Sequence, residues 1–237
     1  EMIAPALAGT KEIAPLENPV FISDLHLAPE HDKTLMQFFR FMKTQVPYYS
    51  ELVILGDLFD FWFEYRRVVP KGFVRTLGKL AELTDRGVRV VFFTGNHDMW
   101  VGDYLARECG LEIHTSPEVM TLSGKKVFIA HGDNMKIDGQ PMLKFLNRIF
   151  RSRTLRWLFS WGVHPDWALR FGHWWSGRSR KGHGEEAARG ASLTEPYTGS
   201  SEPHTEPLVE YAREYSRTHA VDLFVFGHMH FPRDCRE

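Results

Sequence analysis

Cysteine is scarce in this sequence, since Cys109 and Cys235 are the only two among 237 residues. Two thiols so far apart exclude a disulfide framework and a multi-cysteine zinc site, and they favour a reduced, cytosolic compartment. Long apolar runs are also missing, because no stretch approaches the ~20 residues that a membrane-spanning helix needs. The segment from Glu1 to Asn18 lacks the basic residues and the uninterrupted apolar stretch of a signal peptide, so we expect residues 1–18 to form an N-terminal arm.

A charge imbalance is absent as well. The chain has 29 Lys and Arg against 30 Asp and Glu, which gives a net charge of -1 with neutral His. This balance, together with a charged fraction of 25%, argues against a generic nucleic-acid binder and against wholesale disorder. At ~150 residues per domain, we expect one large globular domain or one domain with an insertion.

Five short apolar runs alternate with amphipathic segments along the chain. The runs predict buried strands at residues 19–23, 52–55, 88–94, 127–130 and 222–226. Helical patterns occupy residues 33–46, 71–86, 101–108 and 207–219, with Gly87 and Gly110 as C-terminal stops of two of them. Strands that alternate with helices predict a layered α/β fold.

Each of the five predicted strands is followed at once by polar residues that could bind a metal. The blocks are Asp24-Leu-His26, Gly56-Asp57, Gly95-Asn96-His97-Asp98, His131-Gly132-Asp133 and Gly227-His228-Met-His230. Ligands of open α/β sheets bind at the carboxyl ends of the strands, so these five blocks should meet at one site. A single Asp-Leu-His is usually a surface or capping motif, and Gly-Asp alone carries little information. Five such blocks at successive strand ends favour a metal site instead.

The donor types indicate which ions would bind. Asp24 and His26 are two residues apart, which in an extended backbone directs both side chains to one side, and His228 and His230 repeat that spacing. Carboxylates, an amide and imidazoles without thiolate suit Mn, Fe or Zn, and suit Ca poorly. If Asp57 is shared, seven ligands divide between two ions, the arrangement used for in-line phosphoryl displacement. The predicted ligands are Asp24, His26, Asp57, Asn96, His131, His228 and His230. Asp133 is either a supporting residue for this site or a simple cap.

Residues 134–206 interrupt the strand–helix pattern and are predicted to form a helical cap inserted into a core of residues 19–133 and 207–237. Residues 136–181 contain ten basic and two acidic residues, a net charge of +8, together with many aromatic side chains. One interpretation is purely structural: the aromatic side chains pack the cap onto the core, and the basic run is a solvated face. The alternative is a binding surface, for which the candidate residues are Trp174, Trp175, Arg178, Arg180 and Lys181.

The five motif blocks, in this order, resemble the calcineurin-like metallophosphoesterase superfamily over roughly residues 20–232. The resemblance implies a four-layer αββα sandwich. It also implies one metal held by Asp24, His26, Asp57 and His230, and a second held by Asp57, Asn96, His131 and His228. A bridging hydroxide would be the nucleophile, because metal coordination can lower the pKa of bound water to ~7. His97 would act at the leaving-group oxygen as an acid or charge stabiliser, oriented by Asp98.

Longer stretches around three blocks resemble the UDP-2,3-diacylglucosamine pyrophosphatases of lipid A biosynthesis. These are Phe21 to Leu27, Gly56 to Trp62 and Gly95 to Trp100, followed by a helical insertion. The chain resembles a divergent set of that family, with His97 where better-known members carry Arg. The resemblance implies Mn-dependent hydrolysis of the substrate to UMP and 2,3-diacylglucosamine 1-phosphate (lipid X), with Zn, Fe or Mg as alternative ions. The cap would receive the acyl chains, and the protein would act as a peripheral protein on the inner face of the bacterial cytoplasmic membrane, without nucleic acid as a partner.

Two alternatives remain open from the sequence. One is a calcineurin-like phosphoesterase with another phosphomonoester or phosphodiester as substrate. The other is a non-catalytic scaffold of the same fold, which predicts gaps in the ligand set, and the sequence has none. The oligomeric state is not predicted.

Overall fold

The computed structural model describes residues 13–28, 32–65, 67–135, 152–167, 170, 207–229 and 234. Several predictions concern residues outside these ranges. They include His230, Cys235, most of the N-terminal arm and most of the cap, with Trp174, Trp175, Arg178, Arg180 and Lys181. Among the described residues, no helix has both the length and the apolar composition needed to cross a membrane.

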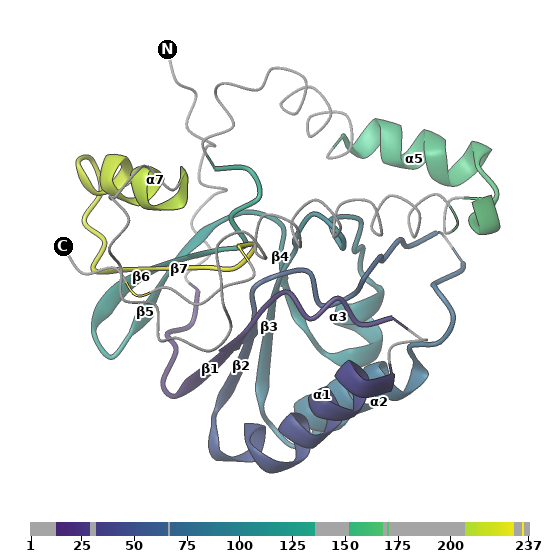
Figure 1. Ribbon diagram of the computed structural model, residues 1–237, viewed down its shortest axis with the longest axis horizontal. Helices are drawn as coiled ribbons and strands as arrows, with labels where there is room; N and C mark the ends of the chain where they lie inside the picture. The colour runs from purple at the N-terminus through teal and green to yellow at the C-terminus, as the bar shows by residue number, and fades with distance from the viewer. Residues whose placement is uncertain are drawn as a thin grey trace.

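The first sheet consists of four parallel strands in the order β1-β2-β3-β4 (Figure 1). They are β1 (Pro19–Ile22), β2 (Glu51–Ile54), β3 (Arg89–Phe93) and β4 (Glu112–His114). All of β2 is buried, as expected for a parallel strand covered on both faces. The first three strands confirm the predicted runs to within two residues. The sequence did not predict β4, because its three residues, Glu-Ile-His, form no apolar run.

The second sheet has the order β5-β6-β7, with β5 and β6 antiparallel and β6 and β7 parallel. Its strands are β5 (Glu118–Leu122), β6 (Lys125–Ala130) and β7 (Leu223–Phe226). The turn between β5 and β6 is Ser123-Gly124, with φ of 50° and 78°, the positive values that two-residue hairpin loops favour. Strands β6 and β7 were predicted, whereas β5 was not.

Helices lie in the connections between the strands of the first sheet, and further helices lie between β6 and β7. They are α1 (Asp32–Thr44), η1 (Val46–Tyr48), α2 (Val74–Asp85), α3 (Tyr104–Cys109), α5 (Arg153–Gly162) and α7 (Pro207–Ser216). The four predicted helices are confirmed with ends shifted by up to three residues. Gly110 ends α3 with φ of 70°, as predicted, because a residue without Cβ adopts this left-handed conformation at little cost.

The alternation of side chains along β2 and β3 divides the core. Leu52 and Ile54 face a cluster lined by α1, α2 and α3, whereas Val53 and Leu55 face a cluster shared with Val127 of the second sheet and its neighbours. A third cluster joins β6 and β7 to α7. Figure 1 accordingly shows α1 and α2 on one side of the first sheet and α7 across the second. At ~1.5–3 kcal/mol per fully buried apolar side chain, these clusters hold the strands in place.

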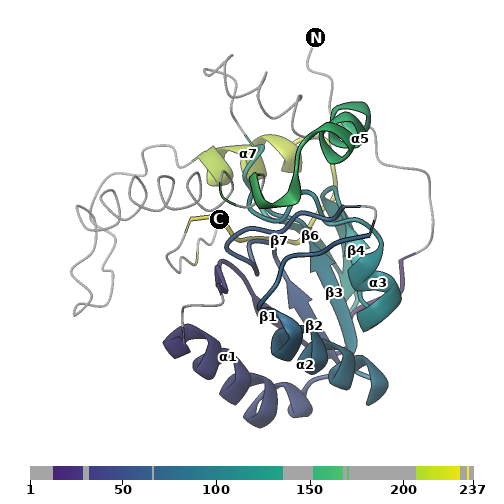
Figure 2. The same cartoon turned by 90° about the vertical axis from the view of Figure 1, so that its right-hand side faces the viewer.

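Helix α5 is seated against the loops that follow β2 and β3. The Phe159 ring lies 5.4 Å from that of Phe63 and 5.1 Å from that of Trp100, and the Tyr65 hydroxyl donates to the carbonyl of Val163 at 3.0 Å. Figure 2 shows α5 at the end of the molecule toward which β2 and β3 point. This is the end where the predicted metal ligands emerge.

Candidate metal centre

The predicted ligands lie just beyond the carboxyl ends of five strands. Asp24 and His26 follow β1, Asp57 follows β2, and Asn96 follows β3. His131 and His228 follow β6 and β7, the parallel pair of the second sheet. Because residues of both sheets share one apolar cluster, side chains from both sheets reach one place.

An unusual backbone conformation marks four of these residues. Asp24, His26, Asp57 and His228 have φ of 54°, 45°, 51° and 72°. In the described part of the chain, Ser123 of the hairpin turn is the only other non-glycine residue with positive φ. Such conformations cost about 1–3 kcal/mol each and persist where surrounding contacts impose them, as at functional sites.

Backbone hydrogen bonds between the loops impose this conformation. The amides of Asp24 and His26 donate to the carbonyls of Gly56 and Asp57, at 3.2 and 3.0 Å, and the amide of Leu27 donates to Leu58. The amide of Trp62 donates to the carbonyl of His97 at 3.0 Å. The β1, β2 and β3 loops are therefore joined directly to each other.

Two glycines allow the loops to approach this closely. A Cβ on Gly56, whose φ is 87°, would lie 2.6 Å from the amide nitrogen of Gly95 and 2.7 Å from Nδ1 of His131. A Cβ on Gly95 would lie 2.7 Å from the amide nitrogen of Asp57. Glycine is thus required at positions 56 and 95 because a side chain has no space there, and at Gly56 also because of its positive φ.

Asp57 lies at the centre of the cluster and is buried. Its Oδ2 is 3.4 Å from Nε2 of His131, 3.9 Å from Nε2 of His26 and 4.0 Å from Nε2 of His97. Its Oδ1 accepts the amide hydrogen of His97 at 2.8 Å. Burial by itself would raise the pKa of this carboxyl, but the three imidazoles, His131 most strongly, lower it well below its usual range. Asp57 is therefore an anion that faces three imidazoles.

His131 is oriented by a backbone carbonyl. Its Nδ1 donates to the carbonyl oxygen of Leu55 at 2.7 Å, which leaves Nε2 facing Oδ1 of Asn96 at 3.2 Å and Oδ2 of Asp57. Histidines that bind metals commonly donate their second N–H in this way. Burial would lower the pKa of His131, yet the charge of Asp57 raises it to about 10. The site attracts positive charge, which a bound cation would supply in place of that proton.

His228 completes this side of the cluster. Its ring centroid is 5.1 Å from that of His131, and its backbone amide donates to Oδ2 of Asp24 at 2.9 Å. Burial, followed by the charge on His131, lowers the pKa of His228 to about 4, so its imidazole is neutral and able to act as a ligand. The charge of Asp133 adds to the raised pKa of His131 and partly offsets the lowered pKa of His228. This effect on both histidines fits a supporting role for Asp133.

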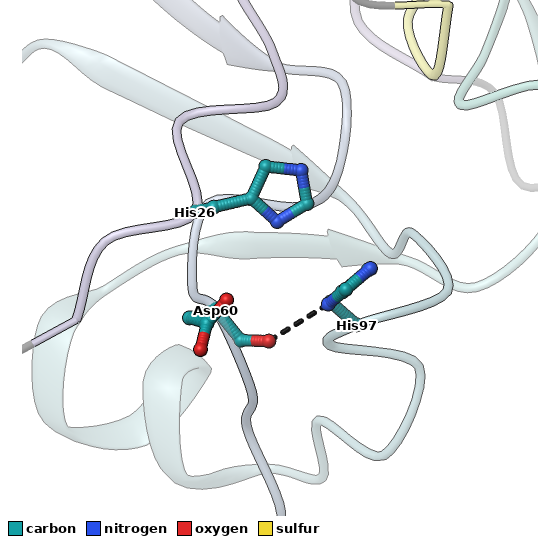
Figure 3. Close-up of side chains that lie close together, drawn as sticks. All are labelled: His26, Asp60 and His97. Atoms are coloured by element: carbon teal, nitrogen blue, oxygen red, sulfur yellow. Dashed lines mark hydrogen bonds between the residues drawn. The ribbon is translucent and has the colours of Figure 1, made fainter. Parts of the chain in front are cut away.

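His97 is held by a residue that sequence reasoning missed. Its Nδ1 donates to the backbone carbonyl of Asp60 at 2.8 Å, and its ring meets that of His26 edge to face at 4.5 Å (Figure 3). Asp60 is itself buried, and its carboxylate lies within 4.8 Å of nitrogens of His26 and His97. In the sequence, Asp60 stood out only as part of the stretch Gly56 to Trp62 that carries the family resemblance. The bond to Nδ1 leaves Nε2 of His97 facing the cluster.

Asp98 was predicted to orient His97, and the structure places its carboxylate on two backbone amides. Its Oδ1 accepts the amide hydrogen of Gly95 at 2.7 Å and its Oδ2 that of Leu58 at 2.9 Å. The side chain is fully buried. Complete burial, together with the charge of Asp57, raises the pKa of Asp98 to about 7.

The donor set fits divalent cations. Donor atoms of Asp24, His26 and Asp57 lie within 4.8 Å of one another, as do those of Asp57, His131 and His228, so two such groups share Asp57. Carboxylate and imidazole donors without sulfur suit borderline or hard ions. His230, the remaining predicted ligand, lies outside the described residues. The residues present therefore fit a divalent-cation centre in which Asp57 belongs to both groups of donors.

Comparison with known proteins identifies the family that this chain matches. The model of the calcineurin-like phosphoesterases matches residues 19–232. A UDP-2,3-diacylglucosamine hydrolase of Porphyromonas gingivalis is 37% identical over 216 residues, which cover 89% of this chain and 82% of the relative. Relatives of the same name in Stenotrophomonas maltophilia and Histophilus somni are 31% and 34% identical; the first alignment covers 90% of this chain and 82% of that protein, and the second covers 61% of each.

These matches confirm the resemblance expected from the five motif blocks. They span both sheets and every described ligand of the cluster built around Asp57. The chain belongs to the calcineurin-like phosphoesterase family and is a hydrolase with a metal-binding cluster.

Proposed function

We propose that this protein hydrolyses the pyrophosphate of UDP-2,3-diacylglucosamine to UMP and 2,3-diacylglucosamine 1-phosphate. The observation that carries the proposal is the convergence of three imidazoles on Oδ2 of Asp57 at the shared end of two sheets. The likeness to relatives named UDP-2,3-diacylglucosamine hydrolase, along about nine tenths of the chain, supports the choice of substrate.

Two divalent cations, for which we propose Mn with Zn, Fe or Mg as alternatives, would supply an activated water and neutralise phosphate charge. One cation would be held by Asp24, His26, Asp57 and His230. The other would be held by Asp57, Asn96, His131 and His228. The proposal is supported by the two groups of donor atoms that share Asp57.

We assign His97 to the leaving-group oxygen. Since the Asp60 carbonyl accepts from Nδ1, the reacting proton or charge must reside on Nε2, which faces the cluster. A positioned imidazole can donate that proton or stabilise the negative charge that develops as the P–O bond breaks. The loops that follow β2 and β3 hold the ring through buried contacts, so its orientation is set before substrate arrives.

The proposed architecture is the four-layer αββα sandwich of the family, with residues 134–206 as a cap over the metal centre. The core would comprise residues 19–133 and 207–237, with residues 1–18 as an arm. In the cap, Arg178, Arg180 and Lys181 would contact phosphates, and Trp174 and Trp175 would line an acyl pocket. The seating of α5 on the β2 and β3 loops supports a cap placed at this end of the molecule.

We further propose that the protein works as a peripheral protein on the inner face of the bacterial cytoplasmic membrane. Trp157, Trp161 and Trp167 are 57%, 75% and 76% exposed, although Phe159 of the same segment packs on the core. Exposed tryptophans within a segment of net charge +8 suit the interface of an anionic bilayer. No nucleic-acid partner is proposed.

The test is release of UMP from UDP-2,3-diacylglucosamine by Mn-loaded protein, measured beside hydrolysis of bis(p-nitrophenyl) phosphate. His228→Ala should abolish both activities, whereas His219→Ala, a matched change at an exposed histidine, should preserve both. Turnover of the aryl ester alone would retain a phosphoesterase and reject the lipid substrate. Absence of both activities in the wild-type protein would favour the scaffold.

A further inference from the structure

The loops that follow β2 and β3 are joined by two hydrogen bonds, each between a carboxylate of one loop and a backbone amide of the other. Asp57 of the β2 loop accepts the amide hydrogen of His97, and Asp98 of the β3 loop accepts that of Leu58, at 2.8 and 2.9 Å. We call these four residues, Asp57, Leu58, His97 and Asp98, the carboxylate clasp. Each loop therefore contributes one carboxylate and one amide to the other.

The clasp is closed off from solvent. The exposed fractions of Asp98 and Leu58 are both 0%, and that of Asp57 is 1%. A buried carboxylate is costly unless donors satisfy it, and both oxygens of Asp98 receive amide hydrogens, from Gly95 and Leu58. Both of these partners are backbone amides, so the contacts of this side chain fix backbone positions.

Those backbone positions decide where the oxygens of Asp57 point. Leu58 directly follows Asp57, and His97 directly precedes Asp98. If the bond between Leu58 and Asp98 is displaced, the bond between His97 and Asp57 is therefore displaced with it. With Oδ1 of Asp57 held by the His97 amide, Oδ2 is the oxygen that faces His26, His97 and His131. The same bonds therefore set the shared carboxylate at the proposed metal centre.

We propose that Asp98 is a positioning residue for Asp57: by holding the Leu58 amide, it fixes the shared carboxylate in the orientation that binds two divalent cations. The inference rests on the proposed function, because it concerns that metal centre. It replaces the idea that Asp98 acts through the ring of His97.

A purely structural role would make Asp98 equivalent to any other buried carboxylate that accepts backbone amides. Glu51 offers the matched control. It is 5% exposed and accepts the amide hydrogens of Glu17 and Asn18 at 3.2 and 3.0 Å. Glu51 begins β2, whereas the metal centre lies beyond the other end of that strand. Asp98→Asn and Glu51→Gln each replace one acceptor oxygen by a donor group without changing side-chain size.

The experiment titrates metal-stripped protein with Mn²⁺ and measures free Mn²⁺ by electron paramagnetic resonance. Asp98→Asn should weaken binding of Mn²⁺ by about 10–100-fold, the usual effect of losing a residue that orients a ligand. Glu51→Gln should bind as the wild-type protein does. In hydrolysis of bis(p-nitrophenyl) phosphate, the Mn²⁺ concentration for half-maximal rate should rise in parallel for Asp98→Asn, and excess Mn²⁺ should recover activity.

Asp98→Glu serves if the Asn variant does not fold. It keeps the charge and both acceptor oxygens but moves them by one methylene, so it should also bind Mn²⁺ more weakly. Wild-type affinity in a folded Asp98 variant would overturn the inference, as would an equal loss in Glu51→Gln. Failure of the wild-type protein to bind Mn²⁺ would refute the metal centre itself and the clasp inference with it.

Discussion

The contact between Gly95 and Asp57 allows a sharp test with a single methyl group. Gly95 lies at the end of β3, and a Cβ there would lie 2.7 Å from the amide nitrogen of Asp57 and 2.8 Å from its Cγ. Carbon atoms pack at about 3.5 Å or more, so Gly95→Ala requires the two loops to separate by on the order of 0.8 Å. The obstructing atoms include backbone, which cannot rotate away. The displaced group would be the carboxylate that the two proposed cations share.

We expect two measurable effects of Gly95→Ala. Overpacking should lower the free energy of unfolding by about 1–3 kcal/mol. A displacement approaching ~1 Å at a catalytic group can cost ~10²-fold in rate, so kcat/KM for an aryl phosphodiester should fall by about that factor. Urea denaturation of metal-stripped protein measures the first effect, and initial rates at saturating Mn²⁺ measure the second.

Gly78 provides the same substitution in an open position. It lies inside α2, and a Cβ there would meet no atom within 4 Å. Gly78→Ala should leave the rate unchanged and raise stability by about 0.5–1 kcal/mol, because alanine loses less conformational entropy in a helix. Wild-type activity and stability in Gly95→Ala would refute the argument that glycine is required there for close approach of the loops.

Three further predictions concern the role of His97, the exposed tryptophans and the ion pair of Glu112. His97→Ala should lower kcat by about 10²–10⁴-fold while Mn²⁺ binding is retained, and an undiminished kcat would remove His97 from the reaction. Replacing Trp157 and Trp161 by alanine should reduce sedimentation with anionic vesicles, whereas Tyr48→Ala, which removes an aromatic ring 77% exposed, should not; equal binding by both variants would contradict the proposed membrane face. A hydrogen bond with His114, together with Arg89, lowers the pKa of Glu112 to about 2 against the opposing effect of burial. Since this folded-state value is below the usual 4.5, the stabilisation is present above pH ~4.5 and is lost as the pH falls toward about 2. The stability difference between the wild-type protein and Glu112→Gln, measured by urea denaturation, should shrink over that range, and a constant difference would refute the assignment.

Short-range sequence patterns predicted five of the seven described strands and the candidate ligands at their carboxyl ends. Asp57 and His131 each follow a continuous apolar run within three residues, and such runs are buried wherever they fold. The two short strands β4 and β5 escaped detection. Their residues are mostly half-buried and partly charged, so neither carries a pattern distinct from that of a loop.

The sequence could not indicate how the blocks touch each other. The family resemblance assigned Asp98 to the neighbouring ring, whereas its partner Leu58 is 40 residues away. Asp60 was overlooked because it holds His97 through its backbone carbonyl, a group that every residue possesses. The extended backbone expected at Asp24 and His26 was wrong, because both residues have a positive φ, which local preference disfavours.

The sequence by itself thus determined which side chains are available for chemistry and at which strand ends they emerge, because apolar runs and the polar blocks after them are local properties of the chain. Only the tertiary structure decided which atoms face Asp57, which carbonyls fix the imidazole rings and which carboxylate joins the β2 loop to the β3 loop. These contacts depend on the order of strands in two sheets and on the close approach at Gly56 and Gly95, which bring together residues far apart along the chain.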